Sequence, residues 1–192
     1  MTNFWHRVAD IYDRVFVSRS WLAAQVAMAQ GVSGRVLEVC CGTGNLLQAL
    51  LDRGIDAYGV DLAPAMVRRA AAKLRRRGHD AHRVLQADAR QLPFGKATFD
   101  FVLATGCLGL MPPATQRQVL AEMARVCRRE LRLLEPFAPT QASLLQRAKT
   151  WCIDGMRPLS GQLLTDMGLT YTVHWHAVAG IFACVSVPLP PA

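Results

Sequence analysis

The sequence predicts an α/β fold with a doubly wound, mostly parallel sheet. Short apolar segments alternate with amphipathic ones from Arg35 to Phe137, an alternation typical of parallel sheets covered by helices on both faces. A glycine-rich turn follows the first apolar segment and opens the first of these helices. The chain has 192 residues, 52% of them hydrophobic and 19% charged, which suits one globular domain with a full core.

Each element is expected from its own pattern. The apolar segments predict parallel strands over 35–40, 56–61, 81–88, 98–106 and 130–137. Helical periodicity predicts helices over 44–54, 63–78 and 113–129, with Pro64 near the start of the second helix and Gly78 past its end. Residues 4–30 are expected to form one or two amphipathic helices before the first strand. The tail predicts two further helices over 139–152 and 159–168, and an antiparallel hairpin of 169–178 and 180–190 at one edge.

Composition limits the compartment and the metal chemistry. The longest strongly apolar run, Ala177 to Val187, is too short to span a bilayer, and the N-terminus lacks the apolar region of a signal peptide. The six cysteines form no C-x-x-C pair and have no histidine at zinc-ligand spacing. We expect a cytoplasmic protein, at most peripheral to a membrane, without metal or disulfides.

The turn from Glu38 to Gly44 reads E-V-C-C-G-T-G. A glycine turn between a strand and its helix lets a ligand approach the backbone, and the helix start offers free N–H groups. The third glycine of a dinucleotide fingerprint is missing. E-x-C-x-G-x-G resembles instead the E/D-x-G-x-G-x-G loop of class I S-adenosylmethionine-dependent methyltransferases. Cys40 stands where that family has a small residue and Cys41 where it varies, so we expect packing thiols.

The resemblance continues in order over residues 34–137 and implies a Rossmann-like, seven-stranded sheet that binds S-adenosylmethionine, with S-adenosylhomocysteine as product. Asp61 resembles the acid that binds the ribose hydroxyls, and Asp88 with Ala89 resembles the adenine contact, although Asp88 could also be a helix N-cap. Glu38 would orient the turn and the amino end of the cofactor. The cofactor-binding residues implied are Glu38, Cys40, Cys41, Gly42, Thr43, Gly44, Asn45, Asp61, Leu62, Met66, Asp88, Ala89 and Thr105.

The same resemblance divides the single domain into an N-terminal helical lid (1–33), a cofactor-binding core (34–137) and C-terminal helices with the edge hairpin (138–192). Tyr12 and Asp13 resemble the Tyr-Asp pair of such a lid. The candidate catalytic residues are Tyr12, which could instead pack on the sheet, and His6, which could be a base or a solvated helix residue. His174 and His176 share one face of a strand, and we favour a surface position over a metal site.

The expected acceptor is a small molecule or a lipid-like compound such as a quinone or phospholipid head group. A cofactor-binding module without catalysis and a nucleic-acid methyltransferase remain as alternatives. The net charge of +8 prompts the latter, but no nucleic-acid-binding module or nucleophile loop is evident. Arg68, Arg69, Lys73, Arg75 and Arg76 are expected to point outward. With Trp5, Phe16 and Trp21 they could contact an anionic membrane. We expect a monomer or homodimer.

One departure from the family pattern concerns the segment before the fifth strand. The resembled family commonly has a Pro-Gly-Gly turn there, and this chain has none. We expect a structural difference at the amino end of the strand, away from the ligand.

Overall fold

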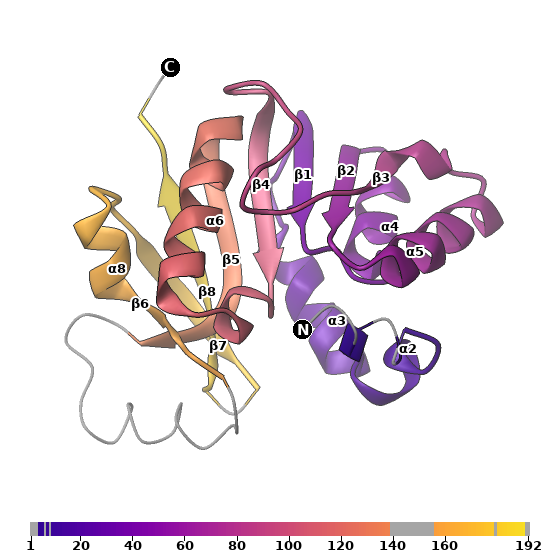
Figure 1. Cartoon of the computed structure of the whole chain (residues 1–192), viewed down its shortest axis with the longest axis horizontal. Coiled ribbons are helices and arrows are strands. Elements are labelled where there is room, and N and C mark those ends of the chain that lie inside the picture. Colours follow the sequence, from indigo (N-terminus) through magenta and orange to yellow (C-terminus); the bar gives the residue numbers. More distant parts are fainter. Residues whose placement is uncertain (1–3, 6, 8, 139–155, 179, 191–192) are drawn as a thin grey trace.

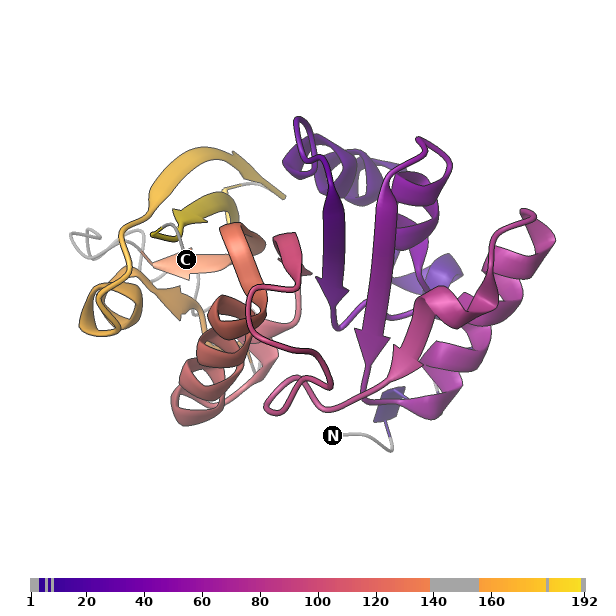
Figure 2. The same ribbon diagram turned by 90° about the horizontal axis from the view of Figure 1, so that it is seen from above.

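A computed structural model of the chain describes residues 4, 5, 7, 9–138, 156–178 and 180–190. It contains one twisted sheet in the order β3-β2-β1-β4-β5-β8-β7, with the short strand β6 paired to β5. Helices lie against both faces of this sheet (Figures 1 and 2). The predicted α/β class and the mostly parallel sheet are confirmed.

Five strands form the parallel half of the sheet. They are β1 (Arg35–Val39), β2 (Asp56–Asp61), β3 (Val84–Gln86), β4 (Phe99–Thr105) and β5 (Cys127–Ala138). β1 lies in the middle of these five strands, paired in parallel with β2 on one side and β4 on the other. β2 and β3 are added on one side of β1, and the chain then crosses to add β4 and β5 on the other side. Ligands of open α/β sheets bind beyond the carboxyl ends of the strands at such a switch point.

Two apolar cores lie on opposite faces of the sheet. Alternate residues of a strand point to opposite faces, so Val36 joins the core under helices α3 (Arg19–Met28), α4 (Asn45–Leu51) and α5 (Pro64–Arg76). Leu37 and Val39 join the other core, which packs against α6 (Pro113–Val126). The central strands β1 and β4 are therefore buried on both faces, as their apolar runs predict, whereas the outer strand β3 is partly exposed.

The C-terminal part forms the predicted edge hairpin. β7 (Thr172–Ala177) and β8 (Phe182–Pro188) pair antiparallel, and β8 also pairs antiparallel with β5. Within the described residues the sheet has eight strands where we expected seven, because β6 (Leu159–Ser160) pairs with the end of β5 before α8 (Gly161–Asp166) begins. A strand of two residues has no periodicity to detect. The helix predicted over 139–152 lies outside the described residues.

Two local differences from the predicted elements have simple causes. The third strand is shorter than expected because residues 81–83 form a 3₁₀ turn, which Asp80 caps by accepting the His82 N–H at 2.8 Å. Before the fifth strand, α6 ends at Val126 and β5 begins at Cys127 with no turn between them. The missing Pro-Gly-Gly segment thus shortens the connection at the amino end of β5, away from the carboxyl edge of the sheet.

The N-terminal segment has two parts. α3 belongs to the core, because Met28 and Ala29 are buried and Arg132 of β5 donates to the Met28 carbonyl at 3.0 Å. The described residues before α3, including the short helix α2 (Tyr12–Val15), lie beyond the carboxyl ends of the parallel strands (Figure 1). The lid role therefore stays a prediction, and it concerns the residues before α3.

Gly44 and Gly54 provide a matched test of the packing between α4 and α5. Both have φ of +75°, but a Cβ at Gly44 would lie 2.9 Å from the Ala70 Cβ, whereas a Cβ at Gly54 would meet nothing within 4 Å. Left-handed strain costs about 1–2 kcal/mol and overpacking about 1–3 kcal/mol. We expect Gly54→Ala to lose about 1 kcal/mol and Gly44→Ala clearly more in urea unfolding. Equal losses would contradict the packing argument.

Candidate functional site

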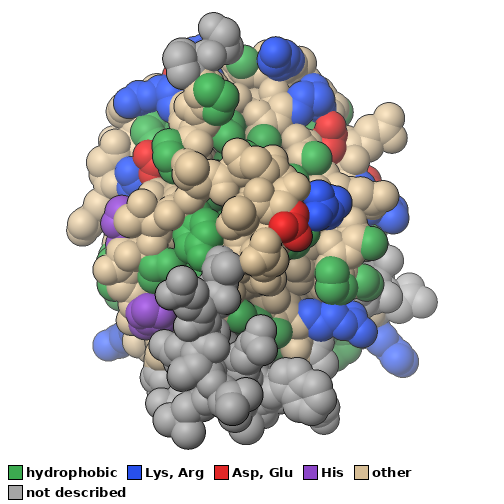
Figure 3. All heavy atoms as spheres, turned by 90° about the vertical axis from the view of Figure 1, so that its left-hand side faces the viewer, with side chains coloured by type: hydrophobic (Ala, Val, Ile, Leu, Met, Phe, Trp, Pro, Cys, Tyr) green, Lys and Arg blue, Asp and Glu red, His purple; other side chains and the backbone are tan. Residues whose placement is uncertain are grey.

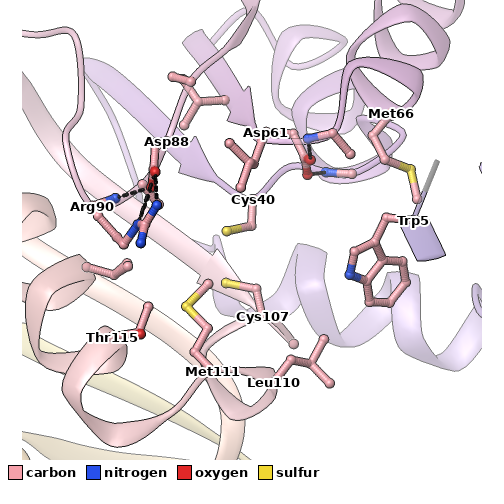
Figure 4. Close-up of a pocket in the computed structure, with 18 of the residues that line it drawn as sticks. Trp5, Cys40, Asp61, Met66, Asp88, Arg90, Cys107, Leu110, Met111 and Thr115 are labelled. Carbon is pink, nitrogen blue, oxygen red and sulfur yellow. Dashed lines mark hydrogen bonds and ion pairs between the residues drawn. The ribbon is translucent and has the colours of Figure 1, made fainter. Parts of the chain in front are cut away.

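A cavity of about 390 Å³ opens at the carboxyl ends of β1, β2 and β4. Its size falls within the range of about 300–1,000 Å³ typical of small-molecule sites. Side chains from opposite halves of the sheet converge on it (Figure 4). The predicted site residues that line it are Tyr12, Cys40, Gly42, Asp61, Leu62, Met66, Asp88, Ala89 and Thr105.

The glycine turn is folded by left-handed residues. Cys40, Gly42 and Gly44 have φ of +57°, +54° and +75°, a region that costs a side-chain-bearing residue about 1–2 kcal/mol. Cys40 therefore occupies a position suited to glycine, with its thiol directed into the cavity (Figure 4). Gly44 starts α4, and its lack of a side chain lets α4 approach Ala70 of α5.

Cys41 is buried and is not among the residues that line the main cavity. A Cβ added at Gly59 of β2 would lie 2.9 Å from the Cys41 Sγ, so the thiol fills the space over a glycine. Burial raises the pKa of Cys41 well above its usual value, which keeps the thiol protonated and unreactive. These observations support the prediction that Cys41 is a small packing residue.

Asp61 joins the end of β2 to the glycine turn. Its Oδ2 accepts the Gly42 N–H at 2.9 Å and its Oδ1 accepts the Ala63 N–H at 2.8 Å (Figure 4). A carboxylate has about four lone-pair sites, so two remain for the hydroxyls of a cis-diol. Burial raises the pKa of Asp61, against the lowering effect of these two N–H groups.

Glu38 lies beneath the turn, with a side chain only 2% exposed. Its Oε2 has no hydrogen-bond partner. Burial raises the pKa of Glu38 to about 8, although the Leu47 N–H and Lys73 act in the opposite direction. A buried carboxyl group in this state favours a nearby cation, because a positive charge would offset the cost of ionisation.

Asp88 and Arg90 form a pair at the cavity rim (Figure 4). Asp88 Oδ1 accepts the Arg90 backbone N–H at 2.9 Å, and its Oδ2 accepts from Nη2 at 2.6 Å. The side chain of Asp88 thus closes its own turn and caps no helix. Since this pair is solvent-exposed, it contributes about 0–1 kcal/mol and can exchange with a ligand donor. Ala89 lines the cavity beside it.

Aromatic rings cover the glycine turn. Tyr12 lies over Gly42, and its ring packs against Trp5 at 5.9 Å and Phe16 at 5.4 Å between centroids. Burial, followed by the charge of Asp13, raises the pKa of Tyr12 to about 12. Tyr12 therefore keeps its proton and suits covering and hydrogen bonding better than general-base catalysis. His6, the other predicted catalytic residue, lies outside the described residues.

The rings of Trp5, Tyr12 and Phe16, with the described residues of the segment 4–16 that carries them, form a cover over the glycine turn. Asp13 connects this cover to the turn. Its Oδ1 accepts from Thr43 Oγ1 at 2.5 Å and from Asn45 Nδ2 at 2.9 Å, while Lys73 Nζ lies 2.9 Å from Oδ2. The side chains of Thr43 and Asn45, predicted to bind cofactor, are thus turned toward the cover. Lys73 was expected to point outward; instead its side chain is 14% exposed, because its long stem reaches from α5 to the carboxylate.

The far wall of the cavity is the loop after β4. The loop contributes Cys107, Leu110 and Met111 to the lining (Figure 4). Glu135 of β5, fully buried, accepts the N–H groups of Cys107 at 3.0 Å and Gly109 at 3.2 Å. Burial raises the pKa of Glu135 to about 7, against the lowering effect of those N–H groups.

Gln116 holds the same loop from α6. It is also buried, and it donates to the carbonyls of Leu108 at 3.0 Å and Met111 at 3.2 Å. Neither Glu135 nor Gln116 was among the predicted site residues. A lone acid within an apolar strand was the available signal for Glu135, whereas Gln116 gave none.

The described residues show no metal-binding group of three or more His, Cys, Asp or Glu side chains. His174 and His176 are exposed on β7, and His174 Nε2 lies 2.8 Å from Ser186 Oγ. The molecular face over the C-terminal elements carries hydrophobic, charged and histidine side chains mixed together (Figure 3). Cysteines 40, 41, 107, 127 and 184 are free thiols.

Comparisons with known proteins agree with this geometry. Residues 36–130 match the family model described as a methyltransferase domain. The chain is 37% identical over 139 residues to a phosphatidylethanolamine N-methyltransferase of Cereibacter sphaeroides, covering 70% of this chain and 67% of that protein. It is 38% identical over 94 residues to a demethylmenaquinone methyltransferase of Thermus thermophilus, covering 48% of this chain and 41% of that protein.

Solved structures share the whole fold. The PH0226 protein of Pyrococcus horikoshii has a TM-score of 0.69 at 21% identity, over 97% of this chain and 98% of that one. Magnesium protoporphyrin IX methyltransferase from Synechocystis, solved with bound S-adenosylmethionine, has a TM-score of 0.64 at 20% identity, over 95% and 78% of the two chains. The chain belongs to the class I S-adenosylmethionine-dependent methyltransferases. S-adenosylmethionine is the methyl donor of this family.

The site residues fit this cofactor. Asp61 has acceptor capacity left for a ribose diol, and the glycine turn leaves its backbone open beneath Tyr12. The partnerless Glu38 Oε2 suits the positively charged amino end. When bound, the cofactor supplies an electrophilic methyl group on a sulfonium.

The Cys40 side chain offers a test of small-residue packing. The Cys40 thiol faces the cavity, and its side-chain hydrogen bond is to the Cys107 thiol, a weak partner. Cys40→Ala should therefore keep S-adenosylhomocysteine affinity within about threefold, or roughly 0.7 kcal/mol. Cys40→Leu should lose at least about tenfold, because the longer side chain would enter the cofactor space. Calorimetric titration measures both. A large loss in the alanine variant, with the fold intact, would show that the sulfur itself is needed.

The raised pKa of Glu38 predicts that the stability of the folded protein depends on pH. Its folded pKa of about 8 lies above its ordinary value of 4.5, so the folded protein binds the extra proton between these values. Its stabilising contribution is complete below about pH 4.5 and is lost as the pH rises through 8. In the wild-type protein, this carboxyl group should lower the free energy of unfolding, measured in urea, by up to about 1.4 kcal/mol per pH unit between pH 5.5 and 7.5. Glu38→Gln should remove that pH dependence. Identical pH slopes in both proteins would contradict the buried-acid account.

Proposed function

We propose that the protein transfers a methyl group to a small-molecule or lipid-like acceptor by in-line displacement. The acceptor would form a bond to the methyl carbon as the bond from that carbon to the sulfonium sulfur breaks. The observation that carries the proposal is the apolar wall that faces the cofactor half of the cavity, formed by Leu110, Met111 and Val119. Such a wall favours an acceptor with apolar bulk.

The two named relatives support this acceptor class. One is named for a phospholipid and the other for a quinone, and both compounds join a polar head to an apolar body. The match covers under half of the quinone methyltransferase, so that similarity concerns the cofactor-binding part.

Each part of the chain has a distinct role in the proposed reaction. Asp61 and the glycine turn hold the donor, Glu135 and Gln116 fix the acceptor wall, and Tyr12 covers the site and excludes water. Positioning of donor and acceptor in attack geometry supplies most of the acceleration in such a displacement.

The described cavity lining contains no histidine or lysine. Tyr12 and the buried thiol of Cys107 have raised pKa values, so neither suits a general base. This favours an acceptor atom that is already nucleophilic near neutral pH. His6 remains a predicted alternative base.

A transfer assay tests the proposal. The protein would be mixed with methyl-labelled S-adenosylmethionine and, in parallel, amine phospholipids, quinols, small amines, RNA and DNA. We expect label in a lipid-like or small-molecule acceptor. Asp61→Ala should weaken cofactor binding by about 1.5–3 kcal/mol, the range for hydrogen bonds to a charged group, and reduce transfer at limiting cofactor.

Asp56→Ala is the control variant, because Asp56 is an exposed residue at the other end of β2 that pairs with Arg35. It should transfer normally. Label in nucleic acid alone would favour the nucleic-acid methyltransferase. Cofactor binding without any transfer would favour a non-catalytic module.

We further propose that the outer face of the cover contacts anionic membranes. Four large apolar side chains of residues 4–16 are exposed, namely Phe4, Ile11, Val15 and Phe16. Exposed arginines lie on the same segment and on α5, among them Arg14 and Arg68. Apolar insertion together with basic charge is the combination that binds bilayers peripherally.

Trp21, which we expected to join this surface, instead packs on Phe182 at 4.9 Å between ring centroids. No helix among the described residues has the length and apolar character needed to cross a bilayer.

Vesicle sedimentation tests the membrane contact. The protein should sediment with phosphatidylglycerol-containing vesicles, less so as salt rises, and little with phosphatidylcholine vesicles. Phe16→Ser should reduce binding, whereas Leu85→Ser should not, because Leu85 is an exposed apolar residue on β3, outside the cover. Binding that ignores salt and lipid charge would contradict the proposed contact.

A further inference from the structure

Two buried side-chain atoms among the described residues lack a hydrogen-bond partner: Gln25 Oε1 and Glu38 Oε2. Both residues are buried: Gln25 is 7% exposed and Glu38 is 2% exposed. Leaving a buried acceptor unpaired is unfavourable, so such atoms in a native protein call for a ligand or a water. Gln25 Oε1 is an acceptor, and Glu38 Oε2 is one when the carboxyl group is ionised, so a group that completes both must donate hydrogen bonds and favour ionised Glu38.

Both residues line one small recess next to the main cavity. The recess has a volume of about 20 Å³ and lies between α3 and the glycine turn. Tyr12, Cys40 and Gly42 line both spaces, so a ligand in the cavity can extend one small group into the recess. A volume of roughly 10–15 Å³ accommodates one group of the size of a water molecule.

The Gln25 side chain is held in place by a hydrogen bond and by the anchoring of its helix. Its Nε2 donates to Thr105 Oγ1 at 2.7 Å, which leaves Oε1 as its unpaired end. α3 itself is anchored to the sheet through Arg132 and the buried Met28. The acceptor is therefore preorganised by the core and does not depend on the cover.

A primary ammonium group matches this recess in size, charge and hydrogen bonding. It carries three N–H donors and no acceptor, and its positive charge offsets the cost of ionising the buried Glu38. The methionine end of the cofactor bears such a group. We infer that Gln25 and Glu38 together bind the cofactor ammonium, with Gln25 as a binding residue contributed from outside the glycine motif. This inference rests on the cofactor assignment.

The rival occupant is a fixed water molecule that donates to the same two acceptors. Ligand comparison separates the two. 5′-Methylthioadenosine shares the adenine, ribose and thioether of S-adenosylhomocysteine but lacks its amino acid end. Only an ammonium-binding recess would make the two ligands respond differently to a change at Gln25.

The experiment is calorimetric titration of both ligands into wild type, Gln25→Leu and Gln25→Glu. The control is Gln118→Leu, the same change at an exposed position of α6. We expect Gln25→Leu to weaken S-adenosylhomocysteine at least about tenfold and 5′-methylthioadenosine by less than about threefold, as about 1.4 kcal/mol per factor of ten implies. Gln25→Glu should raise the preference for S-adenosylhomocysteine, because it adds a second carboxylate. Gln118→Leu should change neither affinity.

Equal weakening of both ligands in Gln25→Leu, or no weakening, would overturn the inference and favour water or a structural role. If that variant does not fold, Gln25→Glu decides: an unchanged or lower preference for S-adenosylhomocysteine overturns the inference. Absence of S-adenosylhomocysteine binding to wild type would instead overturn the cofactor assignment on which it rests.

Discussion

Two carboxyl groups at the carboxyl ends of neighbouring strands, the buried Glu38 and the partly buried Asp61, organise this molecule. Asp61 accepts the Gly42 N–H and thereby fixes the glycine turn against β2, while Glu38 lies beneath the same turn without a partner for Oε2. Burial raises the pKa of both groups. Ionising either group is therefore unfavourable in the free protein, and a cationic ligand would offset that cost at this point of the site. The remaining parts of the site are arranged around it.

Stability and function oppose each other at these positions. An uncompensated buried acid costs stability in the free protein, and a left-handed Cys40 adds strain. Both features are tolerable because the two apolar cores on either side of the sheet are extensive. Ligand binding to the folded state would recover part of this cost by mass action.

The sequence predicted the parallel strands, their helices and the ligand end of the sheet, because these depend on local periodicity and on one turn motif. Asp61, Met66 and Ala89 were predicted from the resemblance to the methyltransferase family, and all three line the cavity. Side-chain direction could not be predicted. Thr43 and Asn45 turn toward Asp13, and Lys73 reaches inward, because these contacts join segments distant in sequence. Gln25 and Gln116 carry no local signal, since their roles depend on which loop each faces after folding.

The central claim is that the carboxyl groups of Glu38 and Asp61 bind the cofactor. Calorimetric titration of the wild-type protein with S-adenosylhomocysteine at pH 7 and pH 9 tests it most directly. Binding of the ammonium-bearing ligand should favour ionised Glu38, so the account predicts saturable one-to-one binding at both pH values with proton release from the protein at pH 7, detected as a dependence of the heat on buffer ionisation. Absence of binding, or binding at pH 7 without proton release, would contradict it.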